Sequence, residues 1–309
     1  MIRFLLSKFL IFISKILLIL KLNSRIINQL NRLRSESHKS DDYRKLISQF
    51  IKSKKLVSLD VGAQGGFFNS GIFSKKYSSF FDPIVVEPIE TEAKKLIDEK
   101  YKVISKGLWS SNCKKKLYIL GKRSGSSSMY KPNKDALHLY DFKSKDFPLF
   151  DITEEIEVHC TTIKESLDNF KIGNLDFLKI DTQGSELEIL KGMGNFFPLM
   201  IKIEVQVFPM YHEVPNWSEL LNYLYKINYM TCEWIEIGKH KTRAPAEMDM
   251  IFIPNYFTEF GKKIILSREK EFASLMIIFG QIKFLQIISN KLNFTTNSEI
   301  QKLNDKFFN

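Results

Sequence analysis

Between about residue 55 and residue 255, short apolar runs rich in β-branched residues alternate with segments of helical periodicity. Seven runs predict β-strands, namely Leu56–Val61, Pro83–Glu87, Lys102–Ile104, Leu175–Asp181, Met200–Val205, Met230–Ile235 and Met250–Ile253. Helical patterns cover Glu90–Glu99, Ser185–Lys191 and Trp217–Ile227. Alternation of this kind predicts an α/β fold built on a doubly wound, mostly parallel sheet of seven strands.

A further pair of candidate strands, Lys116–Leu120 and Ile156–Cys160, lies in the middle of this region. The stretch between them, from Gly121 to Asp151, is polar and follows neither period. We therefore expect a loop-like insertion there.

Residues 1–34 carry the pattern of a basic amphipathic helix, because seven of them are basic and none is acidic. At 100° per residue, Arg3, Lys8, Lys15 and Lys21 fall on one stripe and apolar residues cover the remaining surface. Lys8 and Lys15 interrupt the apolar run before it reaches the roughly 20 residues that cross a bilayer. We expect this helix either to lie on an anionic membrane surface or to pack on the protein or a partner.

The C-terminal part, residues 256–309, shows a wide apolar helical face that includes Phe272, Leu275, Met276 and Ile282. Such a face is typical of core or interface helices. The chain is thus predicted to contain three parts. These are a basic helical segment over residues 1–50, an α/β domain over residues 51–255 and a helical extension over residues 256–309.

The net charge of +11 does not by itself indicate a nucleic-acid partner. Lysine accounts for 38 of the 46 basic residues, and only Arg123, Arg243 and Arg268 follow position 44. Base recognition relies on forked arginine side chains, so nucleic acid ranks low among the expected partners.

The three cysteines, Cys113, Cys160 and Cys232, are widely separated and form no C-x-x-C pair. Their odd number and spacing indicate neither a disulfide framework nor a zinc site. We expect a cytoplasmic protein, held at the inner face of the membrane if the N-terminal helix binds lipid.

A glycine-rich turn, SLDVGAQGG over residues 58–66, follows the first predicted strand. Glycines allow a sharp turn and a close approach to a ligand, but the spacing lacks the G-x-G-x-x-G that seats a pyrophosphate. Asp60 adds a negative charge where a phosphate would lie. The turn therefore favours a cationic cofactor without phosphate, such as S-adenosylmethionine (SAM), with Asp60, Gly62, Gln64, Gly65 and Gly66 as candidate binding residues.

Glu87 ends the second predicted strand, 27 positions after Asp60. An acidic side chain at this place can accept both hydrogen bonds of a ribose diol. We predict that Glu87 binds the cofactor ribose, the alternative being a carboxylate that caps the following helix.

A third motif, LDFLKIDTQGSELEILKG over residues 175–192, ends a buried strand in Asp181. This block resembles the FkbM family of methyltransferases, whose signature here is K-I-D-V-E-G-x-E. The resemblance extends in a consistent order from Ser58 to Pro254, through VVEP, the SGSSSM run, IKIEVQ and MDMIFIP. It implies a Rossmann-like SAM-dependent methyltransferase fold and transfer of a methyl group, usually to oxygen. Gln183 departs from the signature, because the family usually has glutamate there.

Methyl transfer to a hydroxyl requires a group that removes a proton from the acceptor. Asp181 and Glu204 end neighbouring predicted strands, and His212 follows on a loop, so each is a candidate base or substrate ligand. Two carboxylates and a histidine could bind a divalent ion, but their separation in the sequence gives no metal-ligand signature, so no metal is assigned. The expected acceptor is a sugar-like or other polyol molecule.

Two other interpretations remain open at this point. A nicotinamide-dependent sugar oxidoreductase would share the sheet and the ribose carboxylate, but it would need the glycine spacing that is missing here. A non-catalytic membrane-associated binding module would explain the change at Gln183, although Asp60, Glu87 and Asp181 are all retained.

Overall fold

The computed structural model describes residues 40–52, 54–63, 65–69, 73, 75–237 and 244–308, together with Ile13 and Ile16. The amphipathic helix expected over residues 1–34 lies outside these residues, apart from the two isolated positions, as does Gln64. In the described part of the chain, no helix combines the length and the hydropathy needed to span a membrane.

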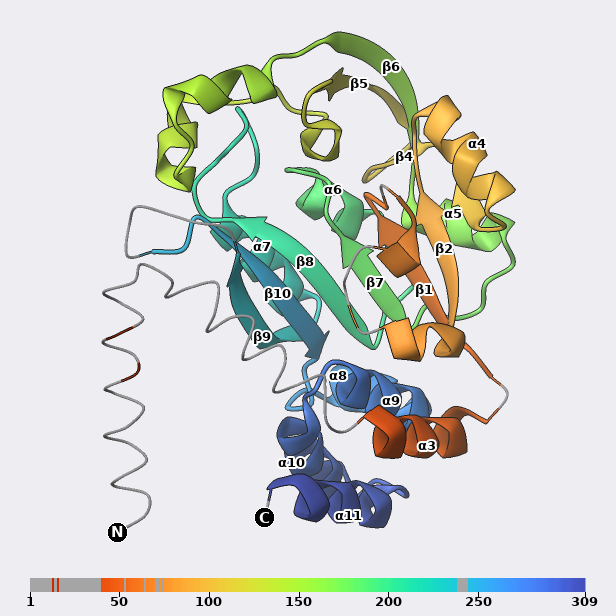
Figure 1. The fold of residues 1–309 in the computed structure, drawn as a ribbon. Helices are drawn as coiled ribbons and strands as arrows, with labels where there is room; N and C mark the ends of the chain where they lie inside the picture. Colours follow the sequence, from red (N-terminus) through yellow and green to blue (C-terminus); the bar gives the residue numbers. More distant parts are fainter. Residues whose placement is uncertain are drawn as a thin grey trace.

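Seven strands form the central sheet in the order β3-β2-β1-β7-β8-β10-β9 (Figure 1). Their bounds are β1 Leu56–Val61, β2 Phe81–Val86, β3 Lys102–Ile104, β7 Phe177–Ile180, β8 Met200–Gln206, β9 Tyr229–Ile237 and β10 Glu247–Pro254. The first five strands of this order are parallel, and β10 runs antiparallel to both β8 and β9. The predicted α/β fold with a mostly parallel seven-stranded sheet is confirmed.

Apolar side chains on both faces of the central strands account for their burial. Leu59, Ile84, Leu178 and Ile201 pack under the helices α5 (Ile163–Asn169), α6 (Glu186–Lys191) and α7 (Trp217–Lys226), which cover one face of the sheet. A strand that is buried on both faces reads as a nearly continuous apolar run. The few charged residues inside these strands therefore need partners for their charges.

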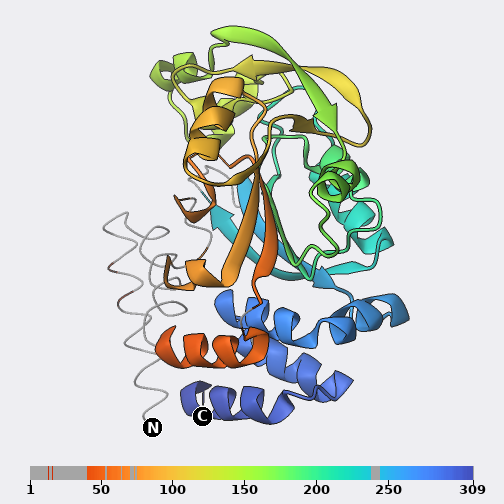
Figure 2. The ribbon, with the colours of Figure 1, turned by 90° about the vertical axis from the view of Figure 1, so that its right-hand side faces the viewer.

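A group of helices packs below the sheet, at the end where the parallel strands begin (Figures 1 and 2). It consists of α3 Ser40–Ile51, α8 Glu259–Ser267, α9 Glu269–Ile278, α10 Ile282–Leu292 and α11 Asn297–Phe308. Its apolar core is continuous with strand residues such as Phe81 and Phe177. Helix α3 precedes the sheet in sequence, yet it packs against α9 near the C-terminus. Helix α4 (Glu90–Asp98) adds Leu96 to the same core.

A second, three-stranded sheet lies above the carboxyl ends of the parallel strands (Figure 1). It contains β4 Gly107–Leu108, β5 Cys113–Ile119 and β6 Glu154–Thr161 in the order β4-β6-β5. Between β5 and β6 the insertion forms short 3-10 helices at Ser124–Ser126, Lys134–Tyr140 and Ser144–Phe150. The expectation of a loop is corrected, because Leu137 and Phe150 are fully buried in a small core with Tyr211.

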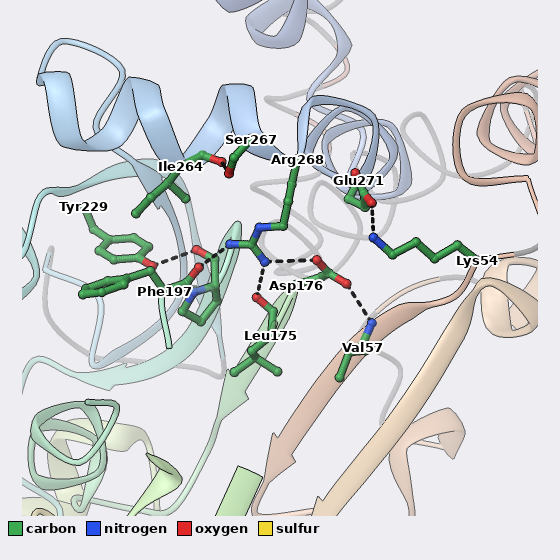
Figure 3. Close-up of polar contacts among 11 residues, drawn as sticks. Lys54, Val57, Leu175, Asp176, Phe197, Tyr229, Ile264, Ser267, Arg268 and Glu271 are labelled. Atoms are coloured by element: carbon green, nitrogen blue, oxygen red, sulfur yellow. Dashed lines mark hydrogen bonds and ion pairs between the residues drawn. The ribbon is translucent and has the colours of Figure 1, made fainter. Parts of the chain in front are cut away.

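Arg268, at the start of α9, joins the helical group to the sheet (Figure 3). Its guanidinium donates to the carbonyl oxygens of Leu175 (2.7 Å) and Phe197 (2.6 Å) and lies 3.1 Å from Asp176 Oδ1. The other carboxylate oxygen of Asp176 accepts from the Val57 amide at 2.9 Å. One buried ion pair thus fixes the amino ends of β1 and β7 to each other and to α9.

We predict that Arg268→Met lowers the free energy of unfolding by about 3–5 kcal/mol, because it leaves the Asp176 carboxylate buried without its cation. Lys54→Met is the matched control, since Lys54 is mostly exposed and pairs with Glu271 beside the same helix. It is expected to cost less than about 1 kcal/mol. Urea unfolding of both variants measures the difference, and equal effects would contradict the role of Arg268.

Candidate functional site

The loops that follow β1, β2 and β7 surround a cavity of about 430 Å³, which we call the glycine-turn cavity. Its lining includes Gly62, Glu87, Asp181 and Ser185 from these loops and Gly125 from the insertion. A cavity at the carboxyl edge of a parallel sheet is the usual ligand position in folds of this class. Its volume is within the range of small-molecule sites.

Gly62 brings the loop after β1 into direct contact with the loop after β7. Its φ is +87°, and a Cβ at this position would lie 1.9 Å from the carbonyl oxygen of Asp181. No residue with a side chain fits there without moving the backbone. Gly65 and Gly66 also have positive φ and turn the chain away from β1, but neither lines the cavity.

Glu87 lies at the rim of the glycine-turn cavity, where it is 8% exposed. Its Oε1 accepts a hydrogen bond from the Ile89 amide at 2.9 Å, and burial raises the pKa of the carboxyl. This contact fixes the orientation of the carboxylate. Within the described part of the chain, Oε2 accepts no hydrogen bond and is available to a ligand.

Ser185 gives the same cavity a second free polar group. Its side chain is 2% exposed, and among the described residues its hydroxyl has no hydrogen-bond partner. Buried hydroxyls are normally satisfied, and Ser185 also lines the cavity, so its hydroxyl is a candidate to bind a ligand there.

Asp60 does not line the cavity. It is fully buried in β1, opposite Lys179 of β7 in the sheet register, and the Lys179 Nζ lies 3.2 Å from Asp60 Oδ1. The same ammonium lies 3.3 Å from Asp181 Oδ2. Burial raises the pKa of Asp60 and the lysine charge opposes this effect. The two aspartates outweigh the burial of Lys179, so the pKa of the lysine is raised and it stays charged.

The sequence interpretation did not single out Lys179, although a signal was present. A lysine inside the otherwise apolar run FLKI is costly to bury unless it is paired. The structure shows that it pairs with both aspartates.

A second cavity, of about 320 Å³, opens beside the first and is called the carboxylate cavity. It is lined by Arg123, Gly125, Ser126, Asp181, Gln183, Glu204, Met210 and Glu247. Asp181 and Gly125 line both cavities. The Asp181 carboxylate therefore lies at the boundary between two adjacent binding spaces.

Three carboxylates share the carboxylate cavity, and their mutual repulsion adds to the effect of burial. The pKa of Glu204 is raised well above its ordinary value by burial and by the charges of Asp181 and Glu247. Burial is also the main cause that raises the pKa of Glu247, to about 7, against the opposing charge of Arg123. Near neutral pH, both the protonated and the ionised forms of Glu247 are therefore populated.

Glu247 was missed in the sequence because the last strand was expected to begin at Met250. In the structure β10 begins at Glu247, which pairs with Gln206 at the end of β8. Since β10 is antiparallel, its first residue lies at the edge where the parallel strands end. The direction of this strand could not be read from its apolar pattern.

A carboxylate of the third motif holds the loop that carries Asp181. Glu186 Oε1 accepts from the amides of Thr182 (3.0 Å) and Gly184 (3.1 Å). A Cβ on Gly184 would lie 2.5 Å from Val214 Cγ1, so glycine is required there as well. Glu186 and Gly184 therefore shape the loop, and the loop places Asp181 at the cavity.

His212 lies apart from the other candidates. It is exposed on the loop after β8, its amide donates to the Lys131 carbonyl, and it is not among the residues that line either cavity. Asp181 and Glu204 are brought together, whereas His212 is not. Over the described residues, no group of three or more His, Cys, Asp or Glu side chains has the geometry to hold a metal ion.

Comparison with known proteins identifies a family. The family model described as "Methyltransferase FkbM domain" matches residues 60–231, more than half of the 309 residues. Among solved structures the chain is similar to a SAM dependent methyltransferase from Aquifex aeolicus, with 14% sequence identity, a TM-score of 0.29, and coverage of 72% of this chain and 92% of that chain. That superposition is too weak to carry an argument about the site. No curated protein matches.

The raised pKa of Glu247 predicts a pH dependence of stability. Unfolded, this carboxyl ionises near pH 4.5, whereas in the folded protein it keeps its proton up to about pH 7. Its contribution to stability is therefore complete below about pH 4.5 and is lost as the pH rises through 7. Glu247→Gln cannot ionise and does not show this loss. The free energy of unfolding of the variant, relative to that of the parent, should therefore rise by on the order of 2 kcal/mol between pH 5 and pH 8.

Thermal unfolding at constant ionic strength measures this gain. The exposed Glu154 provides the control, since Glu154→Gln is expected to show no gain between the two pH values. If the difference in stability between parent and Glu247→Gln is the same at pH 5 and pH 8, the raised pKa of Glu247 is contradicted.

Proposed function

The chain belongs to the FkbM methyltransferase family, and we propose that it transfers a methyl group from SAM to a hydroxyl oxygen of a sugar or another polyol. The observation that carries this proposal is the arrangement of two cavities that share Asp181 and Gly125. A cofactor in one cavity and an acceptor in the other would meet beside the Asp181 carboxylate. Such an arrangement serves a direct transfer between two bound molecules.

The residues of the glycine-turn cavity fit SAM. Glu87 offers a carboxylate oxygen to the ribose hydroxyls, and the free hydroxyl of Ser185 can bind a polar group of the cofactor. Leu108 and Ile189 provide apolar wall for the adenine ring. The turn at Gly62 presents no phosphate site, which agrees with a cofactor that carries none. Bound SAM supplies an electrophilic methyl group on a positively charged sulfur.

Asp181 is the base that this geometry favours. As the acceptor oxygen forms its bond to the methyl carbon and the bond from carbon to sulfur breaks, the hydroxyl proton passes to a carboxylate in contact with the acceptor. Asp181 lines both cavities, and the Lys179 ammonium, 3.3 Å from Asp181 Oδ2, orients the carboxylate. Glu204 and Glu247 lie deeper on the acceptor side, where they can accept hydrogen bonds from further hydroxyl groups.

A polyol acceptor matches the polar groups of the carboxylate cavity. Carboxylates accept hydrogen bonds, and Arg123 donates them, so neighbouring hydroxyls of a ring can each find a partner. The structure gives this cavity few apolar lining residues, Met210 among them. A flat hydrophobic acceptor would leave the charged groups unpaired, which is unfavourable.

We expect Glu87→Gln to weaken binding of S-adenosylhomocysteine by roughly 10-fold to 100-fold, as the loss of a charged hydrogen bond implies. The fold should remain intact, because among the described residues Glu87 forms a hydrogen bond only with the adjacent Ile89 amide. Asp60→Asn makes the matched comparison, since it should lower unfolding stability by roughly 3 kcal/mol by removing one of the two carboxylates that pair with the buried Lys179. Calorimetric titration and thermal unfolding separate the two effects, and unchanged affinity in Glu87→Gln would remove the ribose assignment.

The transfer itself is tested with SAM labelled in its methyl group and a panel of methyl glycosides, with amines and carboxylic acids of similar size as controls. We expect label in a methyl ether of at least one glycoside. Label only in the amine or acid acceptors would contradict the proposed reaction.

On the glycoside that is methylated, Asp181→Asn should bind the cofactor, unfold near the parent temperature and lose about 10²-fold to 10⁴-fold in rate, as expected for removal of a general base. Parent-like turnover by this variant would exclude Asp181 as the base. Glu204→Gln and Glu247→Gln, assayed in the same way, would then identify the group that takes the proton.

A further inference from the structure

The side chain of Gln183 spans the gap between the two carboxylates that meet at the cavity boundary. Its Nε2 donates to Glu204 Oε1 at 2.7 Å and to Asp181 Oδ1 at 3.2 Å. A primary amide has two N–H groups, and both are used by these contacts. Asp181 and Glu204 come from different strands, so the amide is a bridge between them.

The other end of the amide fixes its orientation. Gln183 Oε1 accepts from Gln206 Nε2 at 3.1 Å and lies 3.2 Å from the hydroxyl of the fully buried Tyr211. A flipped amide would place its oxygen against two carboxylates and its NH₂ against the NH₂ of Gln206. The hydrogen-bond pattern therefore places the NH₂ group of Gln183 toward the two carboxylates.

The backbone of Gln183 is held as firmly as its side chain. Its φ is +60°, in the left-handed region, which is unusual for a residue other than glycine. Its carbonyl oxygen accepts from the Ser128 hydroxyl at 2.7 Å, which connects the loop to the insertion. The surrounding structure thus keeps a strained residue in place at the boundary of the two cavities.

We propose that Gln183 is a positioning residue, whose neutral amide holds the Asp181 and Glu204 carboxylates side by side at the acceptor. This inference rests on the proposed function, which places the acceptor at these two groups. Two carboxylates this close repel each other, and two N–H donors offset part of that repulsion without adding charge. The glutamate usual in the FkbM signature would supply no such donor in its ionised form.

The hydrogen bond from Gln183 opposes the rise in the pKa of Glu204 that burial and the neighbouring carboxylates cause. Removing the donors should therefore favour the protonated form of Glu204. Gln183→Met removes the donors at similar length, and Gln183→Glu replaces them with a further carboxyl group. Both substitutions should raise the apparent pKa of Glu204, and the second should raise it more.

Carbon-13 NMR of protein labelled at the Asp and Glu carboxyls measures this titration, with Glu204→Gln and Asp181→Asn used for assignment. We expect the apparent pKa at Glu204 to rise by about one unit or more in both Gln183 variants. Gln281→Glu is the matched control, because Gln281 donates to Glu233 at 2.7 Å away from the site. It should leave the Glu204 titration unchanged, and unchanged titration in both Gln183 variants would overturn the proposal.

Activity adds a second readout. On the glycoside that the parent methylates, the acid limb of kcat/KM should move to higher pH in both Gln183 variants, while cofactor affinity stays close to the parent value. A fall in rate with no movement of the acid limb would contradict a positioning role. If no glycoside is methylated, the proposed reaction fails, and the NMR titration still decides the role of Gln183.

Discussion

Lys179 places a positive charge inside a parallel sheet, where an unpaired ammonium would cost several kcal/mol to bury. Asp60 lies opposite in the register, 3.2 Å from the ammonium, and Asp181 follows two residues later at 3.3 Å. The ion pairs hold the ends of β1 and β7 together, and the close approach of Gly62 to the Asp181 carbonyl depends on that alignment. The two cavities share a wall because Asp181 is fixed at this point.

The fold could be predicted from the sequence because its parallel strands are buried on both faces. The apolar runs around Leu59 and Leu178 are typical of strands covered on both faces, and the helical segments of the sequence supply the cover. The insertion after β5 could not be predicted in the same way. Its buried residues, such as Leu137 and Phe150, are too widely spaced to show a period, and they share a core with Tyr211, more than 60 residues further on.

The site could be predicted only where a glycine or an acidic residue ends or directly follows a predicted parallel strand, because ligands bind at that edge of the sheet. Glu87 and Gly62 line the glycine-turn cavity, and Asp181 and Glu204 meet in the carboxylate cavity, as their strand ends suggest. Asp60 also lies near the end of a strand, but its side chain is buried in the sheet beside Lys179. The pattern of a single strand does not reveal a partner on the neighbouring strand. The position of Glu247 depends on the antiparallel direction of its strand, and the position of His212 depends on the path of a loop. The local sequence pattern predicts neither of them. The basic amphipathic helix over residues 1–34 and its membrane contact stay predictions.

The charged groups of the carboxylate cavity follow from the same constraint. Once Asp181 is paired with Lys179, Glu204 and Glu247 are left with Arg123 and the Gln183 amide as partners in the carboxylate cavity. Burial and repulsion then raise the pKa of both glutamates above the usual value, and that of Glu247 to about 7. The cavity is thereby suited to bind hydroxyl groups, which can donate to an ionised carboxylate and accept from a protonated one.

A crystal structure with S-adenosylhomocysteine bound tests the central claim most directly, since that claim is that cofactor and acceptor meet at Asp181. The account predicts the ribose hydroxyls on Glu87, the adenine ring in the glycine-turn cavity and the sulfur facing the boundary with the carboxylate cavity, next to Asp181. A ribose bound away from Glu87, or a sulfur directed away from Asp181, would contradict it.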